Sequence, residues 1–152
     1  MKHVEHQHQV ALIAWAARTW LPTAADVEPG SKVADYLLAI PNGGRRGKLE
    51  AVRLKAEGVK AGVSDLLLPL RRHDCAGLWL ELKAPGGRPT PAQRDWLRRM
   101  DAAGYRAEWR DDWVSAAQVI AEYVGVNGPA LRAAATIAPV APCVVRRRKC
   151  TG

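Results

Sequence analysis

The sequence contains no phenylalanine, only three cysteines among its 152 residues, and no long apolar segment. A small and odd number of cysteines argues against a disulfide framework and favours a reducing compartment. The apolar stretch at residues 10–17 is only eight residues long and follows Glu5, so we expect neither a membrane span nor a signal peptide. We therefore expect a cytoplasmic protein.

The cysteines and histidines do not indicate a zinc site. Six residues separate Cys143 from Cys150, more than the usual spacing of about two to four residues between zinc ligands. Histidines cluster near the N-terminus, but His6 has no histidine at the i+4 position that would complete a metal-binding helix face. His73 lies in a predicted loop. We interpret the histidines as solvated or phosphate-contacting residues.

Six tryptophans are the main aromatic residues available for packing the core. At 152 residues and 48% apolar composition, the chain is about one domain in size and can bury a core. We interpret the tryptophans as structural. An exposed one could instead stack on a nucleic-acid base.

The net charge of +8 is concentrated in two segments. Residues 41–72 contain eight basic and three acidic residues, and residues 146–149 are all basic. A polyanion such as DNA would be attracted to these segments, and the attraction would weaken as salt is added. The alternative is a solvated helix face whose charges serve solubility.

Two apolar segments, at residues 65–70 and 77–83, predict a β-hairpin with a polar turn between them. Side chains two positions apart in a strand point to the same face, so Glu81 and Lys83 are neighbours. A turn centred near His73 places Asp65 opposite Glu81 or Lys83 in an antiparallel pair. These three charged groups are therefore expected to converge.

Two carboxylates in a small volume repel each other, and a hard divalent cation with oxygen ligands usually relieves this repulsion. Mg²⁺, or else Mn²⁺, held by Asp65 and Glu81 would lower the pKa of a bound water and shield a phosphate. Lys83 would hold the attacking water or neutralise charge that develops on the phosphate. The alternative is that Glu81 and Lys83 form a solvated pair on an edge strand and Asp65 is a turn residue.

The rest of the chain alternates helical and extended patterns. We predict helices at residues 4–20, 47–57, 91–103 and 112–124, and strands at residues 35–40 and 105–109. The last of these helices carries an apolar stripe expected to be buried: Trp113, Ala116, Ala117, Ile120 and Val124. Residues 1–125 are predicted to form one domain. Residues 126–152 are predicted to be a C-terminal extension with a short helix and a flexible basic tail.

Four short elements occur in a fixed order: P-N-G-G-x-R at residues 41–46, G-V-x-D at residues 62–65, E-x-K at residues 81–83 and P-x-Q at residues 91–93. In these elements the chain resembles the virus-type replication-repair nucleases (VRR-NUC), a branch of the PD-(D/E)xK superfamily, and in particular its small stand-alone phage members. The resemblance extends from Glu5 to about Tyr123. Ser64 stands where the family commonly has proline. The resemblance implies an α/β fold with a restriction-endonuclease-like core, in which helices flank a mixed four-stranded sheet.

The resemblance implies that Asp65 and Glu81 bind the metal, that Lys83 is the catalytic lysine and that Gln93 lies beside the site. Glu5, on the first predicted helix, is similar to an additional metal-binding acid of the family. Gln93 has a second interpretation, because residues 90–93 form a capping box in which its side chain would close the helix start, and one amide could not fully serve both roles. The residues predicted to contact DNA are Asn42, Arg45, Arg46, Lys48, Arg53 and Lys60.

The implied activity is that of a metal-dependent, structure-selective DNA endonuclease of phage replication or repair, which acts on branched DNA in a bacterial host cell without an organic cofactor. The small phage members look like homodimers that cut four-way (Holliday) junctions, and a two-fold dimer would set two identical sites at a fixed separation. A monomer would favour flaps or nicks. Two other classes stay open: a non-catalytic basic DNA-binding protein, and a protein-interaction module with a tryptophan-rich surface.

Overall fold

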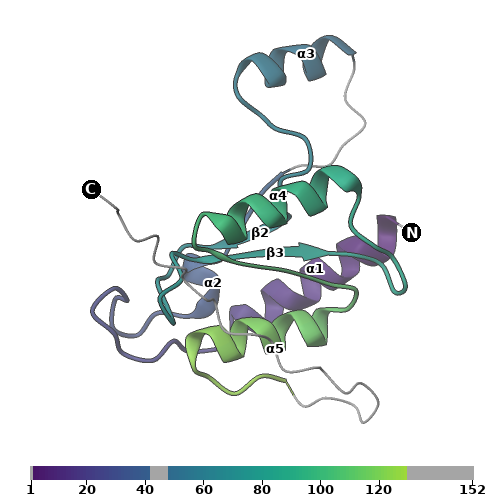
Figure 1. Cartoon of the computed structure of the whole chain (residues 1–152). Helices are drawn as coiled ribbons and strands as arrows, with labels where there is room; N and C mark the ends of the chain where they lie inside the picture. Colours follow the sequence, from purple (N-terminus) through teal and green to yellow (C-terminus); the bar gives the residue numbers. More distant parts are fainter. Residues whose placement is uncertain (1, 42–47, 130–152) are drawn as a thin grey trace, which may run out of the picture.

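A mixed four-stranded sheet forms the centre of the molecule (Figure 1). The computed structural model describes residues 2–41 and 48–129. The strands are β1 (Leu38–Ala39), β2 (Leu66–Leu68), β3 (Leu78–Leu82) and β4 (Arg106–Arg110), in the spatial order β1-β2-β3-β4. Strands β1, β2 and β3 pair antiparallel, whereas β4 pairs parallel with β3. The predicted α/β fold with a mixed sheet is confirmed.

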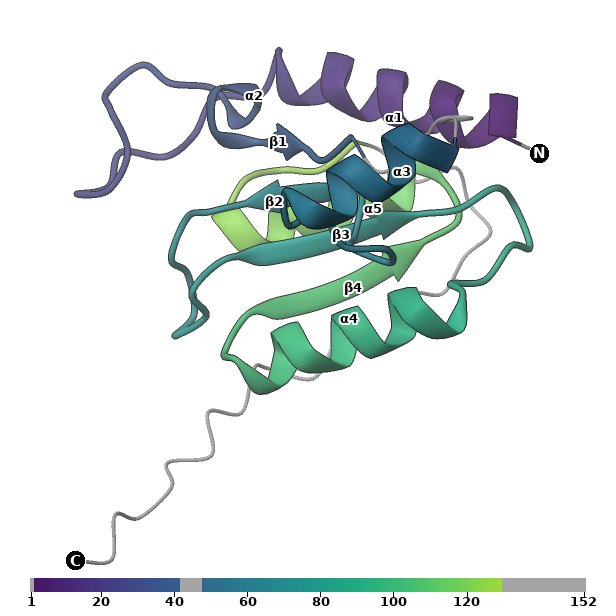
Figure 2. The same ribbon diagram turned by 90° about the horizontal axis from the view of Figure 1, so that it is seen from above.

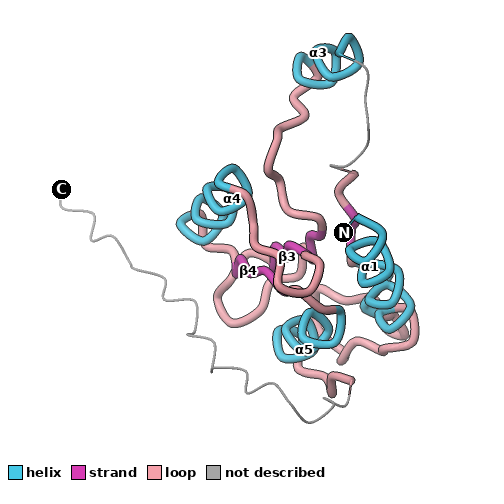
Figure 3. The backbone as a smooth tube through the Cα atoms, turned by 90° about the vertical axis from the view of Figure 1, so that its right-hand side faces the viewer, coloured by secondary structure: helices cyan, strands magenta, loops and turns pink. Residues whose placement is uncertain are grey.

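Helices cover both faces of this sheet (Figures 2 and 3). Helix α4 (Pro91–Ala102) lies on one face, and helices α1 (Lys2–Ala16) and α5 (Trp113–Val124) lie on the other. Helix α2 (Val33–Tyr36) is a single turn before β1. Helix α3 (Lys48–Ala56) stands away from the sheet, at the top of Figure 1.

The apolar core lies between the sheet and helices α1 and α5. Alternate residues of β3 point into it, and Leu78, Leu80 and Leu82 are at most 2% exposed. The predicted apolar stripe of α5 is buried except at Trp113, which is only partly covered. Helix α5 begins where the Asp112 carboxylate accepts a hydrogen bond from the Ser115 amide, 2.8 Å away. One face of the sheet is therefore fully occupied by packing.

The predicted strand at residues 35–40 is wrong in its first half. Asp35 accepts a hydrogen bond from the Lys32 amide at 2.6 Å and so helps to start helix α2 instead of extending the chain. Aspartate favours this role because its short carboxylate satisfies amides that a helix start leaves free. Only Leu38 and Ala39 pair with β2.

The β2–β3 hairpin has the predicted register. Leu66 pairs with Leu80 and Leu68 with Leu78, and the turn is made by His73 and Asp74, whose φ angles are both positive. Asp65, one residue before β2, therefore lies beside Glu81. The basic Arg71 and Arg72 lie at the turn, at the other end of the hairpin from Asp65 and Glu81. Arg72 pairs with Asp26 at 2.7 Å.

No helix in the described part of the chain is both long enough and apolar enough to cross a membrane. The predicted short helix and basic tail, and the cysteine pair near the C-terminus, lie outside the described residues. Helix α5 ends at Gly125, which adopts a left-handed conformation with φ of 76°.

Candidate active site

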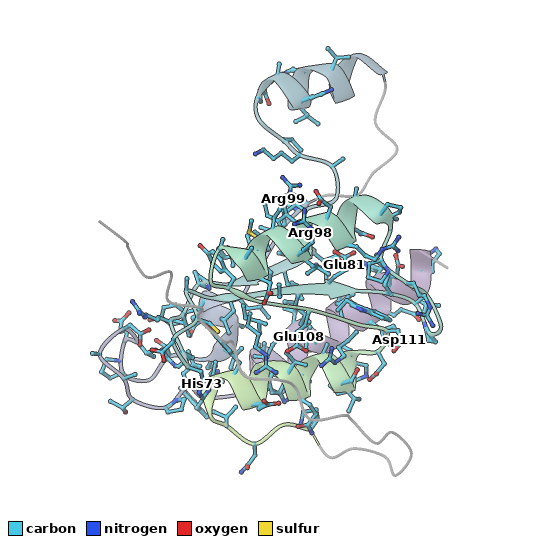
Figure 4. The ribbon with its side chains drawn as sticks, viewed as in Figure 1. His73, Glu81, Arg98, Arg99, Glu108 and Asp111 are labelled. Atoms are coloured by element: carbon cyan, nitrogen blue, oxygen red, sulfur yellow. The ribbon has the colours of Figure 1, made fainter. Side chains whose placement is uncertain are left out.

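The face of the sheet beneath helix α4 carries the candidate site. Residues of β3 alternate between the two faces, so Trp79, Glu81 and Lys83 point away from the leucine core. The Trp79 ring contacts Trp96 of α4 in a T-shaped arrangement with centroids 5.2 Å apart. Glu81 is fully buried, and Figure 4 shows it between β3 and α4. An acidic side chain thus lies at a fully buried position.

Asp65 and Glu81 form a carboxylate pair. The Oδ2 atom of Asp65 accepts a hydrogen bond from the Leu82 amide at 2.9 Å, which fixes the aspartate beside the E-x-K strand. Burial raises the pKa of Asp65 above its usual value. Burial, followed by the neighbouring charge of Asp65, raises the pKa of Glu81 to about 7. Both shifts mean that two negative charges at this position are unfavourable without a cation.

Two donors converge on one oxygen of Glu81. The Lys83 ammonium lies 2.6 Å from Oε1, and the Gln93 side-chain amide donates to the same atom. When both carboxyls are ionised, the other oxygen, Oε2, is buried and accepts no hydrogen bond from the described residues, whereas with one proton Glu81 and Asp65 hydrogen-bond to each other. An unsatisfied buried carboxylate oxygen beside a second carboxylate is an arrangement that a hard divalent cation would complete.

Gln93 performs both of the roles that the sequence analysis considered to be in competition. Its Oε1 accepts from the Thr90 amide at 2.9 Å, and its backbone amide donates to the Thr90 hydroxyl at 3.3 Å, so the capping box is present. Its Nε2 donates to Glu81. The expectation that one amide could not serve both was wrong, because the oxygen caps the helix while the nitrogen faces the acid.

A close backbone contact places Asp65 near the start of α4. Gly62 has φ of 80°, and a Cβ atom at this position would lie 2.7 Å from the backbone of Ala92. Only glycine fits both the left-handed conformation and the short distance. The glycine of the G-V-x-D element therefore allows the segment before β2 to cross α4 closely, which brings Asp65 and Gln93 to the same site.

Glu5 reaches the same end of the sheet but makes a different contact. Its Oε1 accepts a hydrogen bond from the Ala84 amide at 3.3 Å, one residue after Lys83. Its charge contributes to the raised pKa of Asp65. Among residues 2–41 and 48–129, no three histidine, cysteine, aspartate or glutamate side chains are close enough together to hold one ion. The structure thus brings together two of the three predicted acidic ligands and holds Glu5 beside them.

Sequence reasoning missed two side chains that hold the surroundings of the site in place. His8 of α1 accepts a hydrogen bond through Nδ1 from the Trp113 amide at the start of α5, at 3.1 Å. Asp111, which follows β4 and is labelled in Figure 4, accepts from the Gly86 amide at 3.0 Å. The position of Asp111 two residues after the strand predicted at residues 105–109 was a usable signal. No local pattern links His8 to a residue so distant in the sequence.

The predicted DNA contacts are only partly described. Asn42, Arg45 and Arg46 lie outside the described residues, and Lys48 is the first residue of α3. Arg53 of α3 is exposed and forms an ion pair with Glu57 at 2.8 Å, and Lys60 is exposed after the helix. The two described side chains, Arg53 and Lys60, are thus accessible to a partner.

Comparison with known proteins agrees with this geometry. Residues 4–110 match the model of the VRR-NUC domain, which is more than half of the chain. The chain belongs to the VRR-NUC domain family. The matched region begins in α1 and ends with β4, so it contains Glu5, the hairpin and α4.

A solved structure described as a VRR_NUC domain protein is similar over most of both chains. The TM-score is 0.68 at 26% sequence identity, with 82% of this chain and 91% of the other covered. No curated protein matches the chain. The VRR-NUC domain is a nuclease domain of the PD-(D/E)xK type, and such nucleases generally depend on a divalent metal and act on DNA.

Proposed function

We propose that this VRR-NUC protein is a structure-selective endonuclease that cuts four-way DNA junctions as a homodimer, using Mg²⁺ or Mn²⁺. The observation that carries the proposal is the buried Glu81 carboxylate, which has a second acid on one side, an ammonium on the other, and one unsatisfied oxygen. A purely structural role would favour a neutral residue at a fully buried position, since burying a charge is costly.

Asp65 and Glu81 would hold the metal through the two carboxylates that face each other. The metal would supply positive charge to the scissile phosphate and lower the pKa of a water molecule. Lys83, whose ammonium lies 2.6 Å from Oε1 of Glu81, would stabilise negative charge that develops on the phosphate. Gln93 would keep Glu81 oriented through its amide nitrogen. Glu5 would add negative charge near Asp65 and strengthen cation binding.

Charge supports DNA as the substrate, and the choice of a junction follows from the proposed dimer. The basic segment from residue 41 to residue 60 precedes Asp65 directly, so it would approach DNA held at the site. A dimer with two-fold symmetry would present two equivalent sites to a branched substrate with approximate two-fold symmetry. The protein would act in the cytoplasm of a bacterial host, in phage replication or repair. Residues 1–125 would form the nuclease domain.

The test incubates the purified protein with a four-way junction, a flap, a nicked duplex and a linear duplex in Mg²⁺, Mn²⁺ or EDTA. We expect paired cuts in the junction that require metal, 5′-phosphate and 3′-hydroxyl ends, and a dimer in sedimentation. Lys83→Ala should reduce the cleavage rate at least about 100-fold, the scale of removing one stabilising group from a transition state. Lys32→Ala, which removes a lysine stacked on Trp20, is the matched control and should leave the rate unchanged.

Absence of metal-dependent cleavage of every substrate, or full cleavage by Lys83→Ala, would overturn the nuclease proposal. If a monomer cleaved only the flap or the nicked duplex, the substrate would be flaps or nicks and not four-way junctions. Salt-sensitive binding without cleavage would indicate the non-catalytic DNA-binding protein instead.

A further inference from the structure

Trp109 of β4 lies directly beside Glu81. In the parallel pairing of β3 and β4, Glu81 is the partner of Trp109, as Trp79 is the partner of Ala107. Paired residues of adjacent strands share a face of the sheet, so Trp109 lies on the α4 side with the acids. The opposite residues of β4 confirm this orientation, because Arg106 forms an ion pair with Glu122 of α5 on the other side of the sheet.

Three side chains therefore form a row across the sheet: Asp65, Glu81 and Trp109. Neighbouring strands are about 4.8 Å apart, so the indole begins roughly one strand spacing from the carboxylate pair. β4 is the last strand of the sheet, and no further strand pairs with it in the described part of the chain. Trp109 is accordingly only partly buried, although it adjoins a fully buried glutamate.

The aromatic packing beneath α4 is completed without Trp109. Trp79 contacts both Trp96 and Tyr105 through its ring edges and faces, and Arg99 lies over the Trp96 ring. No ring contact joins Trp109 to another aromatic residue within the described ranges. Trp109 thus lies next to a buried acidic site, is partly exposed, and has no aromatic partner among the described residues.

We propose that Trp109 stacks on the nucleotide next to the scissile phosphate; this inference rests on the proposed function. A phosphate bound to a metal at Asp65 and Glu81 would bring its neighbouring nucleotide to the face of the sheet that carries Trp109, which lies one strand spacing, about 4.8 Å, from Glu81. Every base presents a π face, so such a contact is tolerant of sequence and needs only that the base be unstacked. Unstacked bases occur at branch points and not within a regular duplex. Trp109 would therefore favour branched DNA over linear DNA.

The experiment measures cleavage and base stacking separately. Trp109→Ala and Trp109→Phe are compared with the wild type on a junction that carries 2-aminopurine next to the cleaved phosphate. With Ca²⁺ in place of Mg²⁺, a hard divalent cation that can occupy the carboxylate pair, stacking on an aromatic ring before cleavage should quench the 2-aminopurine emission. Trp20→Ala is the control, because Trp20 is 60% exposed but lies after the far end of α1.

We expect Trp109→Ala to abolish the quenching and to lower junction cleavage about 5- to 100-fold, as for loss of one stacked base. Trp109→Phe should keep most of the quenching and most of the cleavage rate. Trp20→Ala should change neither the quenching nor the cleavage rate. Thermal unfolding of each variant shows whether the fold is retained. The proposal is overturned if Trp109→Ala quenches and cleaves like the wild type, or if Trp109→Phe is as defective as Trp109→Ala. If the wild type itself cleaves no DNA, the proposed nuclease function fails, whereas quenching that depends on Trp109 would still support the stacking contact.

Discussion

Replacing Glu81 with glutamine should stabilise the metal-free protein at alkaline pH while abolishing DNA cleavage. Burial and the charge of Asp65 raise the pKa of Glu81 from 4.5 to about 7. Below pH 4.5 the carboxyl is protonated in the folded and the unfolded chain. As pH rises from 4.5 to 7 the folded chain binds more protons than the unfolded one, so the free energy of unfolding falls. Glutamine has no such dependence.

The magnitude follows from the size of the pKa change. A rise from 4.5 to about 7 corresponds to roughly 3 kcal/mol of stability that the wild type loses between those pH values. For a chain of this length, that is a difference of roughly 6–12 °C in Tm. The glutamine oxygen can still accept from Lys83 and Gln93, and its nitrogen can donate to Asp65, so the packing should be preserved.

Urea unfolding in EDTA gives the free energy of unfolding of the variant and of the wild type. The difference between the two is compared at pH 4.5 and pH 8. Glu122→Gln is the control, because the Glu122 side chain is 62% exposed. Adding Mg²⁺ at pH 8 should stabilise the wild type, by about 2.7 kcal/mol at a hundred times its Kd, and should not stabilise Glu81→Gln to the same extent. A difference in the free energy of unfolding that stays constant with pH would contradict a raised pKa of Glu81. So would a wild type that is more stable than Glu81→Gln at pH 8.

Two further substitutions test the packing around the site by chemical denaturation. Gly62→Ala should cost about 2–4 kcal/mol, because the added Cβ would overlap the backbone at the start of α4 in a left-handed conformation. Gly30 has a similar φ but open space around it, so Gly30→Ala should cost only about 1–2 kcal/mol. If both variants lost the same free energy of unfolding, the contact between Gly62 and Ala92 would not be the cause. Tyr123→Phe should cost about 1–3 kcal/mol, because the buried hydroxyl donates to the Leu70 carbonyl at 2.7 Å. Tyr36→Phe removes only an exposed hydrogen bond, the one that the Glu28 amide donates to the Tyr36 hydroxyl. If it lost as much free energy of unfolding as Tyr123→Phe, burial would not be the cause of the Tyr123 effect.

The hairpin and its acids were predictable because their geometry is local. The polar turn at residues 71–76 sets the register, and the register places Asp65 beside Glu81. The capping box at Thr90 was equally readable from four consecutive residues. The strand predicted at Asp35 failed because a single capping carboxylate outweighed an apolar pattern only a few residues long.

The sequence by itself determined which groups could meet, since a strand period of two and a short turn leave little choice of partners for Glu81 and Lys83. Only the tertiary structure decided how deeply those groups are buried and which hydrogen bonds they form. Helix α4 packs over β3 and directs the Gln93 nitrogen onto Glu81, and the burial of Glu81 raises the pKa of this acid to about 7. Helix α1 holds Glu5 on the Ala84 amide, and β4 sets Trp109 beside the acids. These contacts join residues far apart in the chain, so they depend on how helices and strands pack together.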